Sequence, residues 1–182
     1  MKLWLLDADV IIDLLDLGIF DTLVKNAEIF ASETVAGEVK SYNQGLNNIQ
    51  IDFKATYVAT GKVATRSVPV CLIEAIRSTL PGLRRESIDL GELESLAVLQ
   101  NETALTFCSC DAAAIRALPF MGCSERGIST EQMLKLSGLS AQGLKERHTE
   151  KYFRNNLEIG KELKVQSFGT GNKRDKVGKG PK

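Results

Sequence analysis

The 182-residue sequence predicts an α/β fold with a mainly parallel central sheet. Three apolar runs of strand length, at residues 2–6, 27–31 and 104–109, alternate with segments whose apolar residues recur at helical spacing. This alternation is typical of sheets in which helices connect parallel strands. Hydrophobic residues form 43% of the chain and charged residues 25%, which is enough apolar material for a core and excludes a generic disordered chain.

The first half of the chain predicts two strands and three helices in alternation. A strand over residues 2–6 is followed by helices over 10–17 and 19–26, a strand over 27–31 and a helix over 33–42. Gly18 ends the first of these helices, and Ser32 is placed to cap the third. The Asn- and Gly-rich residues 43–48 predict a loop, and residues 57–65 predict a hairpin that turns at Gly61-Lys62.

The second half continues the pattern and ends in a charged helix and a tail. We expect helices over residues 71–80, 111–118, 130–136 and 140–164, a strand over 104–109, and a mobile tail over 168–182. Another helix begins with Asp89 as its N-cap and Glu92 three residues later, which is the pattern of a capping box.

The formal net charge of zero is a cancellation between two parts of the chain. Residues 1–144 hold 12 Lys and Arg against 18 Asp and Glu, whereas residues 145–182 hold 11 against 5. A basic C-terminal segment is typical either of a tail that binds polyanions or of a solvated tail that only aids solubility. In the first case the phosphates of RNA would be neutralised by Lys173, Arg174, Lys176 and Lys179.

The sequence also predicts the compartment and excludes some kinds of site. Four aspartates interrupt the apolar N-terminus, so it does not resemble a signal peptide, and no uncharged apolar run is long enough to span a membrane. Cys108 and Cys110 alternate in an apolar stretch and are expected to be reduced core thiols of a cytoplasmic protein. The single histidine, His148, is expected to be solvated, and a zinc site is not indicated.

Four carboxylates are the candidate site. Asp7 and Asp111 directly follow apolar strands, and ligand sites of parallel sheets lie beyond the carboxyl ends of the strands. Glu38 lies in the helix after the second strand and Glu92 in the first turn of a later helix. Carboxylates held close together repel one another, and Mg²⁺ or Mn²⁺ removes that cost because these cations prefer oxygen ligands. The cluster therefore predicts metal-assisted cleavage of phosphodiesters.

These residues resemble the motifs of the PIN-domain nucleases, especially the PIN-like toxins of bacterial and archaeal toxin–antitoxin pairs. The resemblance covers residues 3 to about 118 and rests on four blocks that begin at Leu5, Glu33, Asp89 and Thr106. They read Leu-Leu-Asp-Ala-Asp-Val-Ile-Ile, Glu-Thr-Val-Ala-Gly-Glu-Val, Asp-Leu-Gly-Glu-Leu-Glu-Ser and Thr-Phe-Cys-Ser-Cys-Asp-Ala-Ala-Ala-Ile-Arg-Ala.

The resemblance implies a three-layer α/β/α sandwich and a Mg²⁺- or Mn²⁺-dependent endoribonuclease site. The implied catalytic and metal-binding residues are Asp7, Glu38, Glu92 and Asp111, and the implied supporting residues are Asp9, Glu94 and Ser109. It also implies an RNA substrate, an antitoxin partner and a homodimer. We expect a PIN-like domain over residues 1–140, a helical extension over 141–165 and a flexible basic tail over 166–182.

Other interpretations of the same residues stay open. Asp7 is placed to cap the following helix, and Glu92 belongs to a capping box, so both have possible structural roles. The pair Asp7-x-Asp9 also resembles the haloacid-dehalogenase phosphatases, in which the first aspartate is the nucleophile and the second an acid/base, although the chain lacks the Gly-Asp pair of that family. A third alternative is a non-catalytic binding module on a PIN-like scaffold.

Overall fold

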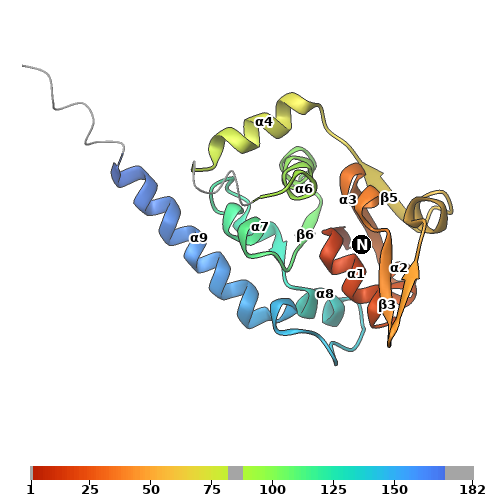
Figure 1. Ribbon diagram of the computed structural model, residues 1–182. Coiled ribbons are helices and arrows are strands. Elements are labelled where there is room, and N and C mark those ends of the chain that lie inside the picture. The colour runs from red at the N-terminus through yellow and green to blue at the C-terminus, as the bar shows by residue number, and fades with distance from the viewer. Residues whose placement is uncertain (1, 82–87, 171–182) are drawn as a thin grey trace, which may run out of the picture.

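The fold is an α/β sandwich with a five-stranded, all-parallel central sheet that helices flank (Figure 1). The computed structural model describes residues 2–81 and 88–170. The strands of the sheet are β1 (Leu3–Leu6), β2 (Glu28–Ser32), β5 (Val63–Arg66), β6 (Thr106–Cys108) and β7 (Gly127–Ile128). They lie in the order β5-β2-β1-β6-β7, so the predicted fold class is confirmed.

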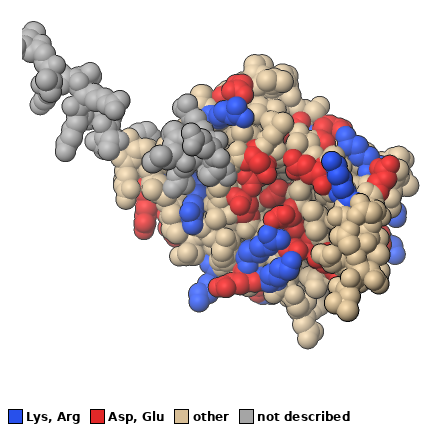
Figure 2. Space-filling view, viewed as in Figure 1, with Lys and Arg blue, Asp and Glu red and all other residues tan. Residues whose placement is uncertain are grey.

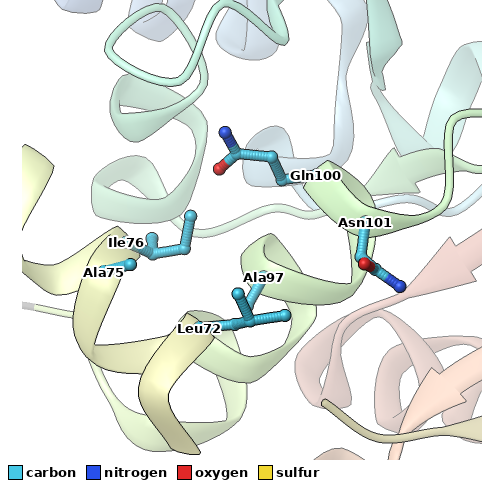
Figure 3. A pocket seen from close by; sticks show the side chains of 6 residues that line it. All are labelled: Leu72, Ala75, Ile76, Ala97, Gln100 and Asn101. Carbon is cyan, nitrogen blue, oxygen red and sulfur yellow. The ribbon is translucent and has the colours of Figure 1, made fainter. Parts of the chain in front are cut away.

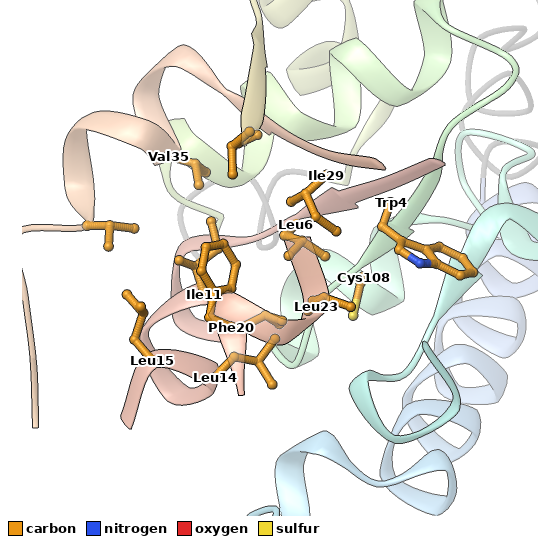
Figure 4. Close-up of a cluster of buried hydrophobic side chains, with 14 of the residues drawn as sticks. Trp4, Leu6, Ile11, Leu14, Leu15, Phe20, Leu23, Ile29, Val35 and Cys108 are labelled. Carbon is orange, nitrogen blue, oxygen red and sulfur yellow. The ribbon is translucent and has the colours of Figure 1, made fainter. Parts of the chain in front are cut away.

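The alternation of side chains along the strands divides the core into two clusters, one on each face of the sheet. Leu5 is in register with Phe30 and Phe107, and all three side chains are buried on one face. Leu6 and Cys108 are likewise in register and are buried on the other face, in the cluster shown in Figure 4. Burial on both faces explains why the strands read as continuous apolar runs.

The helices cover these two faces and bury their apolar stripes there. The cluster around Leu6 is covered by α1 (Ala8–Asp16), α2 (Phe20–Asn26), α3 (Glu33–Glu38) and α8 (Thr130–Leu136). The cluster around Leu5 is covered by α4 (Val70–Thr79), α6 (Leu90–Asn101), α7 (Ala112–Ala117) and α9 (Glu150–Thr170). Every residue of α6 from Gly91 to Leu99 is buried, which makes this helix the centre of its layer.

The expected structure of residues 33–66 is partly wrong. Helix α3 ends at Glu38 rather than at residue 42. The residues that were expected to form the end of this helix and the loop over 43–48 form an antiparallel hairpin of β3 (Ser41–Gln44) and β4 (Asn47–Gln50). Its turn contains Gly45, whose φ of 63° is the left-handed conformation that glycine adopts at low cost. The hairpin expected over 57–65 is absent from this described segment, because a π-helix, η1 (Lys54–Val58), precedes β5 and β5 pairs with β2.

Packing overrides local propensity in η1. The ring of Tyr57 lies edge-on to that of Phe20 at a centroid distance of 5.0 Å, and the ring of Phe53 lies 5.9 Å from that of Phe20. These aromatic contacts bury the segment against α2, and such pairs form across distances that no local sequence pattern shows.

The C-terminal part begins its long helix later than expected. A short 3₁₀ helix, η3 (Glu146–His148), precedes α9, which starts at Glu150 rather than at residue 140. Helix α9 packs against α7, where Phe153 is buried and a β-carbon on Gly160 would lie 2.6 Å from the carbonyl oxygen of Arg116. The tail residues 171–182, with their four predicted RNA contacts, lie outside the described residues.

Candidate functional site

The carboxyl ends of β1 and β6 bring Asp7 and Asp111 to one edge of the sheet. Both aspartates are N-caps: Oδ1 of Asp7 accepts from the Ala8 amide, and Oδ1 of Asp111 accepts from the amides at the start of α7. Ser109 joins them, because its hydroxyl donates to Oδ2 of Asp7 over 2.9 Å and accepts from the Asp111 amide over 3.0 Å. The predicted supporting residue Ser109 thus holds the two strand ends in place.

Glu92 lies in the capping box that begins α6. Its amide donates to Oδ1 of Asp89 over 2.8 Å, and its Oε2 accepts from the Asp89 amide over 3.1 Å. Both hydrogen bonds of the predicted box are therefore present. The side chain of Glu92 is buried, with 7% of the residue exposed.

Glu38 and Glu94 link α3 to the same end of α6. Oε2 of Glu94 accepts from the Thr34 amide over 2.8 Å, which ties the buried Glu94 to the start of α3. The carboxylate of the exposed Glu38 lies over Gly91, where a β-carbon would come within 2.6 Å of Oε2 of Glu38. The glycine of the Asp89-Leu-Gly-Glu92 block therefore leaves room for the Glu38 carboxylate.

The pKa values show which of these carboxylates interact. Burial, and then the nearby charges of Asp111, Asp7 and Asp89, raise the pKa of Glu92 to about 9. Burial also raises the pKa of Asp7 to about 7, against the hydrogen bond from Ser109 that favours its ionised form. The Glu92 carboxyl therefore lies close enough to Asp7 and Asp111 for their charges to disfavour its ionisation.

Glu38 belongs to the adjoining part of this acidic edge. Although the residue is exposed, partial desolvation of its carboxyl group and then the charges of Asp89 and Glu94 raise its pKa, while Lys40 acts in the opposite direction. Glu38 is thus coupled to the start of α6, and Asp7 is not among the groups that shift its pKa. The structure brings the four predicted acids to one edge in two adjoining parts.

The donors of this edge fit a hard divalent cation in chemistry, since all of them are carboxylate oxygens. Within residues 2–81 and 88–170, however, no three His, Cys, Asp or Glu side chains are grouped as a ready-made metal site. The hydrogen bonds described above leave Oδ2 of Asp111 and Oε1 of Glu92 without a partner among the described residues. These two oxygens are therefore the ones available to a cation, whereas both oxygens of Asp7 already accept hydrogen bonds.

Asp9 does not join this group of oxygens. Its Oδ2 accepts a hydrogen bond from Arg147 Nη1 over 2.6 Å, so the predicted supporting residue forms an ion pair at the rim of the acidic edge. Figure 2 shows acidic side chains gathered in the middle of one face of the molecule, with basic side chains beside them.

The prediction that His148 is solvated is wrong. His148 is buried, its Nε2 lies 2.6 Å from Oδ2 of Asp13, and its Nδ1 lies 2.8 Å from the hydroxyl of Thr130. Lys145 and Arg147 contact the same buried Asp13 carboxylate. Sequence reasoning missed this network, because Asp13 lies 132 to 135 positions before Lys145, Arg147 and His148 and the residues form no local motif.

A separate apolar pocket of about 220 Å³ lies between α4 and α6 (Figure 3). It is lined by Leu72, Ala75, Ile76, Ala97, Gln100 and Asn101. None of the predicted site residues lines this pocket, and its lining has no charged group for acid–base or metal chemistry.

Comparison with known proteins adds no assignment. No family model, no curated protein and no solved structure matches this chain. The resemblance to the PIN-domain nucleases therefore stays a prediction.

No helix in the described part of the chain is long and apolar enough to cross a membrane.

Proposed function

We propose that this protein is a Mg²⁺- or Mn²⁺-dependent endoribonuclease whose site contains Asp7, Glu38, Glu92 and Asp111. The observation that carries the proposal is the electrostatic coupling of the buried Glu92 to Asp7 and Asp111 at the carboxyl edge of a parallel sheet. Such an edge is where α/β folds bind ligands. A group of carboxylates that destabilise one another's charge is suited to a divalent cation, which offsets the repulsion.

The residues of the edge divide the work of such a site. When bound, the metal ion would polarise a phosphate of the substrate and lower the pKa of water for attack on phosphorus. Asp7 and Asp111 supply carboxylate oxygens that the two helix N-termini and Ser109 orient. Glu92 would hold the cation through the oxygen that the capping box leaves unpartnered, and Glu94 ties the start of α3 to α6.

The biological role is a further part of the proposal. The resemblance to PIN-like toxins supports a cytoplasmic toxin that is a homodimer and that a protein antitoxin holds inactive. This proposed role rests on the four sequence blocks alone. The free thiols of the buried Cys108 and Cys110 agree with a reducing compartment.

The phosphatase alternative is less consistent with the contacts at Asp7. In that mechanism the second aspartate of Asp7-x-Asp9 transfers a proton to the leaving group, and the exposed ion pair of Asp9 with Arg147 does not exclude this role. Asp7, the nucleophile in that mechanism, is 5% exposed and holds hydrogen bonds on both carboxylate oxygens. A non-catalytic binding module would keep the fold and show no turnover.

The test is cleavage of a labelled single-stranded RNA by the purified full-length chain with and without Mg²⁺ or Mn²⁺. Cleavage is expected only with the metal, and Asp7→Asn or Asp111→Asn is expected to reduce it more than about 100-fold, because each removes a charged donor. Glu125→Gln is the matched control, since Glu125 is an exposed carboxylate on η2 (Ser124–Arg126). Cleavage that survives both aspartate substitutions would contradict the proposal.

A further inference from the structure

Arg147 is held from one side by a buried carboxylate. Its Nη2 and Nε donate to Oδ2 of Asp13 over 2.5 and 3.2 Å, and the Asp13 side chain is 5% exposed. Because two nitrogens of the planar guanidinium bind one fixed carboxylate, the orientation of the whole group is set before any ligand arrives.

Asp13 does not depend on Arg147 alone. Lys145 donates to Oδ1 of Asp13 over 2.5 Å, and His148 contacts Oδ2 over 2.6 Å. Although burial opposes ionisation, the hydrogen bonds from Lys145, His148 and Arg147 lower the pKa of Asp13 to about 2. The charge of Asp13 is therefore well compensated, and it anchors residues 145–148 to α1.

The remaining side of Arg147 faces the acidic edge. Its Nη1 donates to Oδ2 of Asp9, whose side chain is 51% exposed, and Asp9 lies in the first turn of α1, two residues after Asp7. An exposed ion pair of this kind is weak, because water competes for both groups. Replacing Asp9 by a ligand anion at Nη1 therefore costs little free energy.

We propose that Arg147 binds a backbone phosphate of the RNA substrate beside the carboxylate edge, with its Nη1 exchanging the Asp9 carboxylate for the phosphate. The assignment rests on the proposed ribonuclease function. Arginine suits this role because its charge is permanent and its planar fork matches phosphate oxygens. In this account Asp13 is the residue that positions Arg147, and Asp9 occupies the phosphate position while RNA is absent.

Three other cations are less suited to the same task. Lys54 and Arg66 are paired with Glu33 and Glu102. Lys145 contacts Asp13 through its only charged nitrogen, so it has no second fixed donor to offer. Among these four cations, Arg147 alone is fixed by one carboxylate, that of Asp13, and has a further nitrogen whose partner, Asp9, is exposed and can be replaced.

The test measures binding of a labelled single-stranded RNA as a function of salt, in the full-length chain carrying Asp111→Asn so that cleavage does not interfere. Arg147→Gln is expected to weaken binding roughly tenfold and to reduce the slope of log K against log salt by about 0.7, the value for one phosphate contact on a single strand. Asp9→Asn is expected to tighten binding, because it releases Nη1, and to do so less when Arg147→Gln is also present.

The matched control is Arg154→Gln, which removes an exposed arginine that is likewise paired, with Glu150 on α9. It is expected to leave the affinity and the salt slope unchanged. Asp9→Asn keeps all contacts between Arg147 and Asp13, so its effect on RNA affinity tests the proposed phosphate contact even if Arg147→Gln does not fold. If the role of Arg147 were purely structural, Arg147→Gln would lower the melting temperature and leave the salt slope at its value for the unsubstituted Arg147, and Asp9→Asn would not change the RNA affinity.

The outcomes separate the two proposals. RNA that is bound and cleaved with a salt slope independent of Arg147 overturns this inference and leaves the ribonuclease proposal standing. An Arg147-dependent slope without cleavage by the wild-type chain supports the phosphate contact and overturns the nuclease. Absence of RNA binding overturns both.

Discussion

The hydroxyl of Ser109 donates a hydrogen bond to Oδ2 of Asp7 over 2.9 Å, although the two residues are 102 positions apart in the chain. This bond joins the ends of the adjacent strands β6 and β1. It stabilises the ionised form of a carboxylate that burial would otherwise keep protonated. Ser109 is therefore placed to control the charge and orientation of Asp7.

Replacing Ser109 by Ala removes this donor. We expect the pKa of Asp7 to rise above its value of about 7, so that activity with Mg²⁺ appears at higher pH than in the wild type. The loss of orientation is expected to reduce activity at neutral pH by about 10- to 100-fold, the range for partners that hold a metal ligand. The measurement is a pH–rate profile, with Ser109→Thr as the control that keeps the hydroxyl. An unshifted profile in Ser109→Ala would show that the bond does not govern Asp7.

The metal-free protein is expected to lose stability as the pH rises from about 5 to about 9. The folded state raises the pKa of Glu92 from 4.5 to about 9, so it holds a proton that the unfolded chain has already released in this interval. Each unit of pH there favours unfolding, and Asp7 adds the same effect below about pH 7.

Thermal melts in the presence of a chelator measure this dependence. Glu92→Gln is expected to flatten the curve, because glutamine does not titrate and still offers an oxygen to the Asp89 amide. The control Glu125→Gln should keep the wild-type curve. Addition of Mg²⁺ should raise the melting temperature most at high pH, where the carboxylates are ionised. Equal slopes for the wild type and Glu92→Gln would contradict the assignment.

Gly91 gives a test of Glu38 that does not alter its carboxylate. A β-carbon in Gly91→Ala would come within 2.6 Å of Oε2 of Glu38, and the flexible Glu38 side chain must move away. We expect activity to fall by about tenfold or more if Glu38 contributes to the site, with a change in unfolding free energy below about 1 kcal/mol. Activity and chemical unfolding are measured on the same preparation. Full activity would remove Glu38 from the site.

Gly160 tests the packing of α9 against α7. The β-carbon of Gly160→Ala would lie 2.6 Å from the backbone oxygen of Arg116, which cannot move as a side chain can. We expect a loss of about 1–3 kcal/mol in unfolding free energy from overpacking. Gly37→Ala on α3 is the control: no atom lies within 4 Å of its added β-carbon, so the helix should gain about 0.5–1 kcal/mol. Similar effects at both positions would show that α9 does not pack as described.

The three central strands of the sheet, β2, β1 and β6, and their carboxyl edge were predictable because their signals are local, whereas β5 was expected in a hairpin and β7 was not expected. The strand at residues 2–6 ends at Asp7, and the capping box of Asp89 and Glu92 is complete within four residues. Parallel topology then brings strand ends to one edge without knowledge of any side-chain contact. The apposition of Glu38 and Gly91 follows from helix packing, which sequence spacing does not show.

The parts that differed from expectation depend on distant partners. The hydroxyl of Thr130 and the carboxylate of Asp13 hold the ring of His148 in the interior, so its location near a charged segment was misleading. The ion pair of Arg147 with Asp13 could not be predicted for the same reason, because it forms only when η3 packs on α1. Local charge patterns identify basic residues without showing which of them are fixed.

The most direct test of the central claim is a crystal structure of the full chain soaked with Mn²⁺, with the ion located by its anomalous scattering. The account predicts a peak coordinated by oxygens of Asp7, Glu92 and Asp111, lost in crystals of Asp111→Asn and retained in those of Glu125→Gln. It also predicts that Glu92 turns its unpartnered oxygen to the ion. A structure in which these carboxyl groups keep their hydrogen bonds at saturating Mn²⁺ and bind no ion would contradict it.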